Sequence, residues 1–214
     1  TSNKGLHINI TQANVQTLYS NEADHTNNYI SSGKHDILAK QFDEQRQHIV
    51  CLQECCEHEG TSSIGRYFTI SSPKDHSGHF GCQIWLNKTP YSDLDRLAFN
   101  QKHYTTLIAE PRLLMIKANN RFGSFLIVSA HAPGEIHGYN TRLEWFQRLQ
   151  LLLLQHGHNS TTILGIDANT TVGNQVSDNI GDCNGETEDS IGLAFHTLLL
   201  SLIHISEPTR RITI

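Results

Sequence analysis

The hydrophobic pattern in the first half of this chain alternates between short strand-like runs and one helical segment. Apolar and polar residues alternate over Leu6–Ile10, which predicts a strand that enters a polar turn at Gln12–Asn14. Residues Lys34–Gln47 follow a helical period that places Ile37, Leu38 and Phe42 on one face. Compact apolar runs then predict three strands, with the sequences HIVCLQE (48–54), RYFTISS (66–72) and FGCQIWL (80–86).

The second half adds a hairpin, two helices and a further strand. The runs RLLMIKA (112–118) and SFLIVSAH (124–131) flank NNRFG and predict a β-hairpin. Thr141 and Glu144 have the spacing of a capping box for a helix over Arg142–Gln155, and TTILGID (161–167) is the next predicted strand. A Gly- and Asn-rich loop at 173–186 leads to a last helix near Ser190–Leu202. Because hairpins alternate with helices, we predict one α/β domain over residues 1–202, whose sheets combine parallel and antiparallel neighbours.

Composition narrows the class of protein. Hydrophobic residues make up 37% and charged residues 17% of the 214 residues, which is typical of a globular protein. The formal net charge of −5 argues against non-specific nucleic-acid binding, which depends on Lys and Arg neutralising phosphates. It does not exclude an enzyme that cleaves phosphodiesters, because an acidic metal site itself contributes negative charge. No apolar run approaches membrane-spanning length, so we expect no membrane partner, and five cysteines without a CxxC pair indicate reduced thiols.

Polar side chains follow several of the predicted apolar strands. Glu54 ends one predicted strand and His131 ends another. The run TILGIDAN ends in Asp167 and Asn169. Asn14 lies just past the first predicted strand. Taken singly, each residue has an ordinary structural explanation, since a carboxylate after a strand is commonly solvated and Asp-x-Asn commonly stabilises a turn. Ligand sites of α/β folds form at the carboxyl ends of strands, so the ordered set of five predicts one site.

The order of these motifs resembles that of the endonuclease/exonuclease/phosphatase superfamily. That family has an Asn after its first strand, QE after its second, Y-x-P after a central strand and GD-x-N after a later one. This chain has Asn14, LQE at 52–54, HAP at 131–133 and GIDAN at 165–169. SGHFGCQIWL is similar to the Gly-rich turn and strand of the family, and NGETEDSIGLAF (184–195) resembles the N-x-x-G-x-x-L-x-x-F run in endonuclease domains of non-LTR retrotransposons.

The resemblance implies a four-layer α/β sandwich, in which two mixed β-sheets pack face to face with helices outside. It also implies Mg²⁺-dependent hydrolysis of a phosphate ester, with Mn²⁺ as the alternative ion. Glu54 would hold the metal ion, and Asn14 would support that ion or a phosphate oxygen. Asp167 would orient or deprotonate the attacking water, and Asn169 would hydrogen-bond the phosphate.

Two features depart from the family pattern. His131 stands where the family usually has Tyr; a His can also donate to a phosphate oxygen, with a changed pH dependence. The family closes with a strand that ends in S-D-H, and no such motif follows Leu202. The tail at 203–214 resembles translated adapter sequence, so we expect the C-terminal strands of the sandwich to be missing, which can leave this chain inactive.

Three functions stay open on the sequence. The first is a DNA-nicking endonuclease of retrotransposon type, which would be joined to or encoded with a reverse transcriptase and would act in the nucleus. The second is a phosphatase or phosphodiesterase for a small or lipid substrate, which the acidic charge favours. The third is a binding remnant of the same fold without catalysis, which the absent closing motif favours. In each case we expect an intracellular protein.

Overall fold

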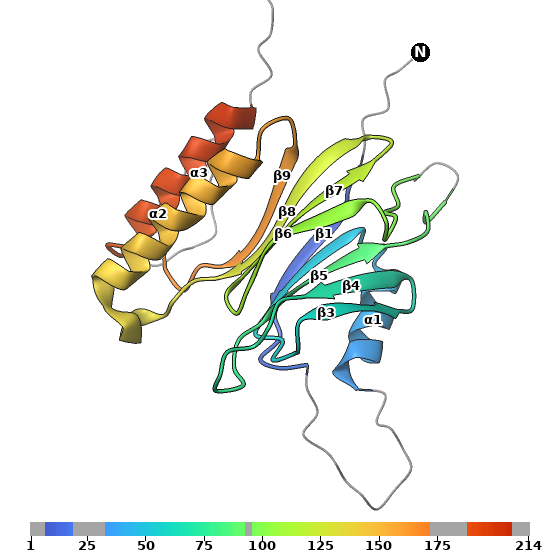
Figure 1. The fold of residues 1–214 in the computed structure, drawn as a ribbon, viewed down its shortest axis with the longest axis horizontal. Helices are drawn as coiled ribbons and strands as arrows, with labels where there is room; N and C mark the ends of the chain where they lie inside the picture. Colours follow the sequence, from blue (N-terminus) through green and yellow to red (C-terminus); the bar gives the residue numbers. More distant parts are fainter. Residues whose placement is uncertain (1–6, 19–32, 93–95, 172–187, 207–214) are drawn as a thin grey trace, which may run out of the picture. The chain divides into compact units, whose positions relative to one another are not determined.

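The computed structural model describes residues 7–18, 33–92, 96–171 and 188–206, with the backbone alone for 203–206. The described residues form two compact units (Figure 1). The first unit ends at His131 and also includes 162–167, and the second contains 132–161 and the residues from 168 onward. We describe each unit by itself. The start of the first predicted strand at Leu6, the loop at 173–186, Cys183 and the tail from 207 lie outside the described residues.

Over its described residues, the first unit contains two β-sheets and one helix, α1 (Lys34–Glu44). Its strands are β1 (Ile10–Asn14), β2 (Ile49–Gln53), β3 (Gly60–Ile64), β4 (Tyr67–Ser71), β5 (Cys82–Asn87), β6 (Tyr104–Glu110), β7 (Leu113–Asn120), β8 (Gly123–His131) and β9 (Thr161–Asp167). The five-stranded sheet has the order β1-β2-β5-β4-β3, in which β1 is parallel to β2 and the other neighbours are antiparallel. The four-stranded sheet has the order β6-β7-β8-β9, in which β7 is antiparallel to both of its neighbours.

Two hydrophobic clusters hold the layers of this unit together. The cluster between the sheets takes fully buried side chains from both of them, including Ile49, Cys51, Ile84, Leu114, Ile116 and Ile127. On the outer face of the five-stranded sheet, Phe42 of α1 packs edge-on against Trp85 of β5, with ring centroids 5.8 Å apart. All five residues of β2 are buried, because the strand is covered on both faces, and its sequence therefore shows no alternation. The predicted α/β class with two mixed sheets packed face to face is confirmed.

The first strand lies later in the chain than predicted. β1 covers Ile10–Asn14 instead of Leu6–Ile10, so the predicted polar turn at Gln12–Asn14 is part of the strand. β1 is an edge strand, and its extent is set by parallel pairing with β2, where Asn14 lies opposite Gln53. Hydrogen bonding to β2 therefore decides its bounds, and the alternation of its own side chains does not.

The predicted first helix is confirmed with a shorter C-terminus. α1 ends at Glu44 rather than Gln47, because Arg46 has a left-handed φ of 54°. The backbone N–H of Gln47 donates to the carbonyl of Phe42, and that of Arg46 donates to Asp43, which together form a Schellman motif. Ile37 was predicted on the buried face but is 66% exposed.

Two edge strands were not predicted. β3 (GTSSI) is mostly exposed and pairs only with β4, and β6 lies at the other sheet's edge beside β7. Neither has the compact apolar run that identifies a buried strand. The predicted hairpin is confirmed as β7 and β8, where Asn120 pairs with Gly123 across a two-residue turn.

The second unit contains the 3₁₀ helix η1 (Glu135–His137) and the helices α2 (Gly138–His156) and α3 (Gly192–Ser206). The predicted capping box at Thr141 and Glu144 is wrong. Because η1 leads directly into α2, the helix begins at Gly138 and both residues lie inside it. Phe146 of α2 and Phe195 of α3 pack together with ring centroids 5.5 Å apart. None of the helices in the described ranges has the length and apolar character needed to cross a bilayer.

Asp189 stabilises the start of α3. Its Oδ1 accepts hydrogen bonds from the Thr170 hydroxyl and from the backbone N–H groups of Ile191 and Gly192. Burial acts to raise the pKa of Asp189, but these hydrogen bonds and the nearby Arg142 guanidinium outweigh it, so the pKa is lowered from 3.8. The folded state therefore prefers the ionised carboxylate at this position.

We expect Asp189→Ala to lower the free energy of unfolding by about 1 kcal/mol at neutral pH, the usual contribution of a helix cap. The pKa of Asp189 is lower in the folded state than in the unfolded state, so the carboxylate contributes stability at pH values above its unfolded-state pKa. This contribution is lost as the pH falls from that value through the folded-state pKa. The difference between wild type and variant should therefore narrow in urea titrations below about pH 4. Asp36→Ala, in the first turn of α1, is the matched control; a difference for Asp189→Ala that stays constant with pH would contradict this account.

Candidate metal-binding site at the strand ends

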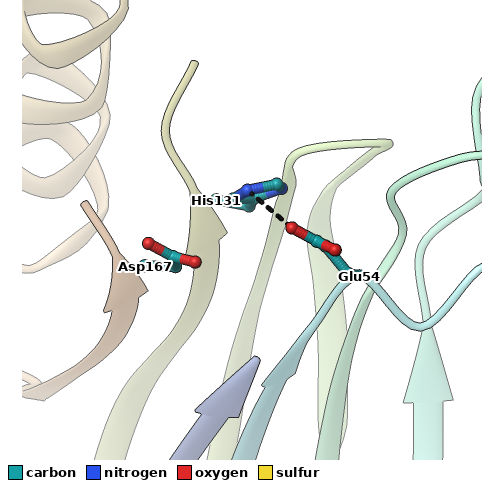
Figure 2. A group of neighbouring side chains, drawn as sticks. All are labelled: Glu54, His131 and Asp167. Atoms are coloured by element: carbon teal, nitrogen blue, oxygen red, sulfur yellow. Dashed lines mark ion pairs between the residues drawn. The ribbon is translucent and has the colours of Figure 1, made fainter. Parts of the chain in front are cut away.

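Three of the predicted site residues meet where three strands end (Figure 2). Glu54 follows β2 directly, His131 is the last residue of β8, and Asp167 is the last residue of β9. Each offers one ligand atom, and these atoms all lie within 4.8 Å of one another. Because the strands are anchored in the core between the sheets, the positions of these side chains are set by rigid elements. The ends of β8 and β9 lie together, so these two strands run in the same direction.

Asn14, at the end of β1, joins the two carboxylates. Its side-chain amide nitrogen donates to Glu54 Oε1 and to Asp167 Oδ2, each at 2.8 Å. Its Oδ1 accepts from the backbone N–H of Gln16 at 3.1 Å. The amide therefore presents its donor side to the carboxylates and links Asn14 to Asp167, 153 positions further along the chain.

The backbone at Glu54 has a conformation that side chains rarely adopt. Its φ is 56°, in the left-handed region, immediately after the extended residues of β2. For a non-glycine residue this costs of order 1 kcal/mol or more, and such strain is concentrated at functional sites. The turn points the carboxylate toward His131, whose Nε2 lies 3.3 Å from Glu54 Oε1.

His131 is buried and lies between a carboxylate and a guanidinium. Nη1 of Arg112 is 3.4 Å from His131 Nδ1, on the side of the ring opposite Glu54. The ring of Phe80 packs against His131 at 5.6 Å and against the Arg112 guanidinium at 3.6 Å. Burial, followed by the charge of Arg112, lowers the pKa of His131 from 6.5, although Glu54 and Asp167 oppose the shift. Burial and the Arg112 charge therefore favour the neutral form of the imidazole.

A buried hydrogen-bond network lies directly behind the site. The side-chain amide of Gln53, which precedes Glu54, donates to Ser129 Oγ at 3.0 Å and to the carbonyl of Gly165 at 3.3 Å. Ser129 in turn donates to the carbonyl of Leu52 at 2.8 Å, and Gln12 donates to Gln53 Oε1 at 3.0 Å. Ser129 and Gly165 each lie two residues before a site residue, so this network fixes the register of β1, β2, β8 and β9 beneath the site.

Gly165 lets the two sheets approach closely beneath the site. A Cβ added there would lie 2.4 Å from Cβ of Cys51 and 3.0 Å from its Sγ. Both residues belong to strands buried between the sheets, and a clash between backbone-attached atoms cannot be relieved by rotating a side chain.

We expect Gly165→Ala to lower the free energy of unfolding by about 1–3 kcal/mol, the range for overpacking a core. Thermal or urea unfolding followed by circular dichroism measures this effect. Gly134→Ala is the matched control, because a Cβ at Gly134 meets nothing within 4 Å. A Gly165→Ala protein as stable as the Gly134→Ala protein would show that the close approach of the sheets is not as described.

Asn169 belongs to the second unit and is described there. Its φ is 45°, its side-chain amide donates to the carbonyl of Ala132 at 2.7 Å, and its own carbonyl accepts from Arg142. The first unit thus brings together Asn14, Glu54, His131 and Asp167, and Asn169 follows two residues after Asp167. The roles assigned to all five residues, including Asn14 as a metal ligand, stay predictions.

Sequence reasoning missed two residues at this site, Arg112 and Phe80. Arg112 begins the run RLLMIKA that was identified only as a strand of the hairpin, and Phe80 lies in the Gly-rich turn before β5. Neither position carries a sequence signal of its own, because their association depends on the pairing of β7 with β8 and on the turn at Phe80.

Comparison with known proteins identifies the fold. The chain matches no model of a known protein family and no curated protein sequence. Among solved structures, it is similar to the endonuclease domain of TRAS1, a telomere-specific non-LTR retrotransposon, with 15% identity and a TM-score of 0.57 over 91% of this chain and 72% of that chain. It is also similar to an AP endonuclease from Archaeoglobus fulgidus, with 15% identity and a TM-score of 0.54 over 92% of this chain and 71% of that chain.

At this level of identity the similarity defines the fold. Both neighbours align over about nine-tenths of this chain. The chain therefore has the same fold as these two endonuclease structures, which agrees with the fold that the resemblance of the motifs implies.

Proposed function

We propose that this chain is a divalent-metal-dependent phosphodiesterase that nicks DNA. The observation that carries the proposal is the meeting of the Glu54 and Asp167 carboxylates with His131 and Asn14 at the ends of four strands. The two structural neighbours with the same fold are endonucleases by name, which supports a nucleic-acid substrate for the same arrangement.

The donor set fits a hard divalent cation. Two carboxylates with ligand atoms within 4.8 Å repel each other, and a cation between them would offset that repulsion. Carboxylate oxygens are the ligands that Mg²⁺ and Mn²⁺ prefer. Glu54 would hold the ion, and Asn14 would reach it by turning its amide to present Oδ1. When bound, the ion would stabilise negative charge on the phosphate and on the leaving oxygen.

The chain's own residues supply the remaining chemistry. Asp167 would accept the proton of the attacking water or orient it toward phosphorus. His131 would donate a hydrogen bond to a phosphate oxygen, in the place where the family usually has a phenol. Asn169 would donate a second hydrogen bond to the phosphate, and neutral donors of this kind act most strongly on charge that develops in the transition state.

We further propose that the domain is of retrotransposon type and is encoded with a reverse transcriptase, which would place it in the nucleus. The NGETEDSIGLAF segment and the TRAS1 domain among the structural neighbours support this proposal. A phosphatase for a small or lipid substrate is the second candidate, because the net charge of −5 is less suited to a polyanionic duplex.

Nicking of supercoiled plasmid with the protein in excess over DNA tests the proposal. We expect conversion to open circles with Mg²⁺ or Mn²⁺, none with EDTA, and much slower conversion with Glu54→Gln. Release of phosphate from inositol phosphates without plasmid nicking would favour the second candidate. Wild-type protein that cleaves neither substrate with either ion would refute hydrolysis and favour a binding remnant of the fold.

A further inference from the structure

We propose that Arg112 is a positioning residue that fixes the neutral tautomer of His131 with its proton on Nε2. The inference concerns the two sides of one imidazole ring. Nδ1 lies 3.4 Å from Nη1 of Arg112, and Nε2 lies 3.3 Å from Oε1 of Glu54. A neutral imidazole has one N–H donor and one acceptor nitrogen, and the hydrogen bond at one nitrogen decides the state of the other.

Both neighbours of the ring select the same tautomer. A guanidinium carries donors only, so its contact with Nδ1 is favourable only when Nδ1 presents its lone pair. An ionised carboxylate carries acceptors only, so the contact of Glu54 with Nε2 is favourable only when Nε2 carries the proton. The opposite tautomer would set an N–H against Arg112 and a lone pair against Glu54, and both contacts would then be repulsive.

Arg112 is held in place by contacts that do not involve the ring of His131. Its guanidinium lies 3.6 Å from the centroid of the Phe80 ring, a cation–π contact. The Phe80 carbonyl accepts from the N–H of Cys56, and the N–H of Gly81 donates to Pro111, so the turn that carries Phe80 is bonded on both sides. The backbone N–H of His131 donates to the Arg112 carbonyl at 2.9 Å. The guanidinium is therefore preorganised beside Nδ1.

The tautomer determines what His131 can do at the site. With the proton on Nε2, the ring has an N–H group that faces the carboxylates. This group can donate a hydrogen bond to a phosphate oxygen, as a phenol hydroxyl would. A metal ion at Nε2 would need the lone pair there and would force a proton onto Nδ1 against Arg112. Arg112 therefore disfavours His131 as a metal ligand and leaves the ion to the oxygen atoms of the site. This functional consequence rests on the proposed hydrolysis; the tautomer itself does not.

Nitrogen-15 NMR of the labelled full chain without metal tests the inference. Long-range proton–nitrogen correlations show which ring nitrogen is protonated, and His131→Gln identifies the His131 signals among the 14 histidines. The measurement is made well above the usual His pKa of about 6.5, so that the ring is neutral. We expect wild type to carry the proton on Nε2, Arg112→Met to shift the population toward Nδ1, and Arg112→Lys to retain more of the Nε2 form than Arg112→Met.

Arg121→Met is the matched control, because Arg121 follows the opposite end of β7 and its replacement removes the same charge. Its His131 signals should match those of wild type. Protonation of Nδ1 in the wild type, or an unchanged tautomer in Arg112→Met, would overturn the inference. A move of the proton to Nδ1 on addition of Mg²⁺ would also overturn it, because His131 would then be a metal ligand.

A pair of substitutions tests the functional consequence. If His131 acts as a donor, His131→Tyr should retain nicking activity, whereas His131→Phe should lose about a hundredfold or more, the usual effect of removing one donor to a developing charge. Equal activity of the two variants would contradict the donor role. Absence of nicking in the wild type refutes the proposed function and leaves the NMR result standing on its own.

Discussion

Asp167→Asn is expected to reduce phosphodiester hydrolysis by on the order of a thousandfold or more while the protein stays folded. The variant keeps the shape of the side chain and one oxygen that can accept from Asn14, but it removes the negative charge and the ability to accept a proton from water. Asp167 ends β9 and is held by Asn14 at 2.8 Å, so the substitution acts at a fixed position. Single-turnover nicking rates at saturating Mg²⁺ measure the effect.

Asp36→Asn is the control for this loss, because Asp36 is an exposed carboxylate on α1. It removes the same charge from the chain and should leave the rate unchanged. Wild-type rates for Asp167→Asn would refute its assignment as the base or the orienting group for water.

Glu54→Gln is expected to lower hydrolysis by a similar factor and also to weaken binding of the divalent cation. An amide is a poorer ligand than a carboxylate for a hard cation, and the variant removes one of two charges that would hold the ion. Glu57→Gln is the matched control, because Glu57 lies three residues further on and pairs with His35 at 3.5 Å instead of joining the cluster. The measurement is the nicking rate as a function of Mg²⁺ concentration. If Glu54→Gln reaches half of its maximal rate at the same Mg²⁺ concentration as wild type, Glu54 does not hold the ion.

Glu54 also gives a test that separates function from stability. Its φ of 56° is a conformation that glycine adopts without strain. Glu54→Gly should therefore be close to wild type in its free energy of unfolding, in spite of losing the contacts to Asn14 and His131. A Glu54→Gly protein with a clearly lower free energy of unfolding than wild type would show that the Glu54 carboxylate contributes to the stability of the fold.

The parts of the site that could be predicted from the sequence are those that follow buried strands. Apolar runs such as IVCLQ and FLIVSA are buried on the sheet faces, and the first polar group after each run marks the strand end. Glu54, His131 and Asp167 were found in this way, and the structure brings them together. The order of the motifs along the chain then predicted the fold.

The features that could not be predicted depend on pairing between distant segments. β1 was placed four residues too early because an edge strand is defined by its neighbour, and the bridging position of Asn14 follows from that register. β3 has polar residues on exposed faces and no apolar run to identify it. Arg112 reaches His131 only because β7 and β8 form a hairpin in which Leu113 lies opposite Ala130.

Two glycines show how a motif can be recognised before its reason is known. Gly165 in GIDAN and Gly192 in GLAF were quoted as letters of family motifs. In the structure, a Cβ at Gly165 would meet Cys51 at 2.4 Å, and one at Gly192 would meet the carbonyl oxygen of Thr171 at 2.0 Å. At each position the neighbouring residue of the same unit lies too close to the glycine backbone for a Cβ to fit. No pattern in the sequence predicts these distances.

Titration with Mn²⁺, followed by electron paramagnetic resonance, tests most directly the claim that the strand ends form a metal site. It reports occupancy of the site without requiring turnover, so it applies whether or not this chain is active. We predict a single saturable Mn²⁺ site in the wild type that Mg²⁺ displaces, and loss of that site in the Glu54→Gln/Asp167→Asn double variant. Binding of Mn²⁺ with equal affinity by both proteins, or no binding by the wild type, would contradict the account.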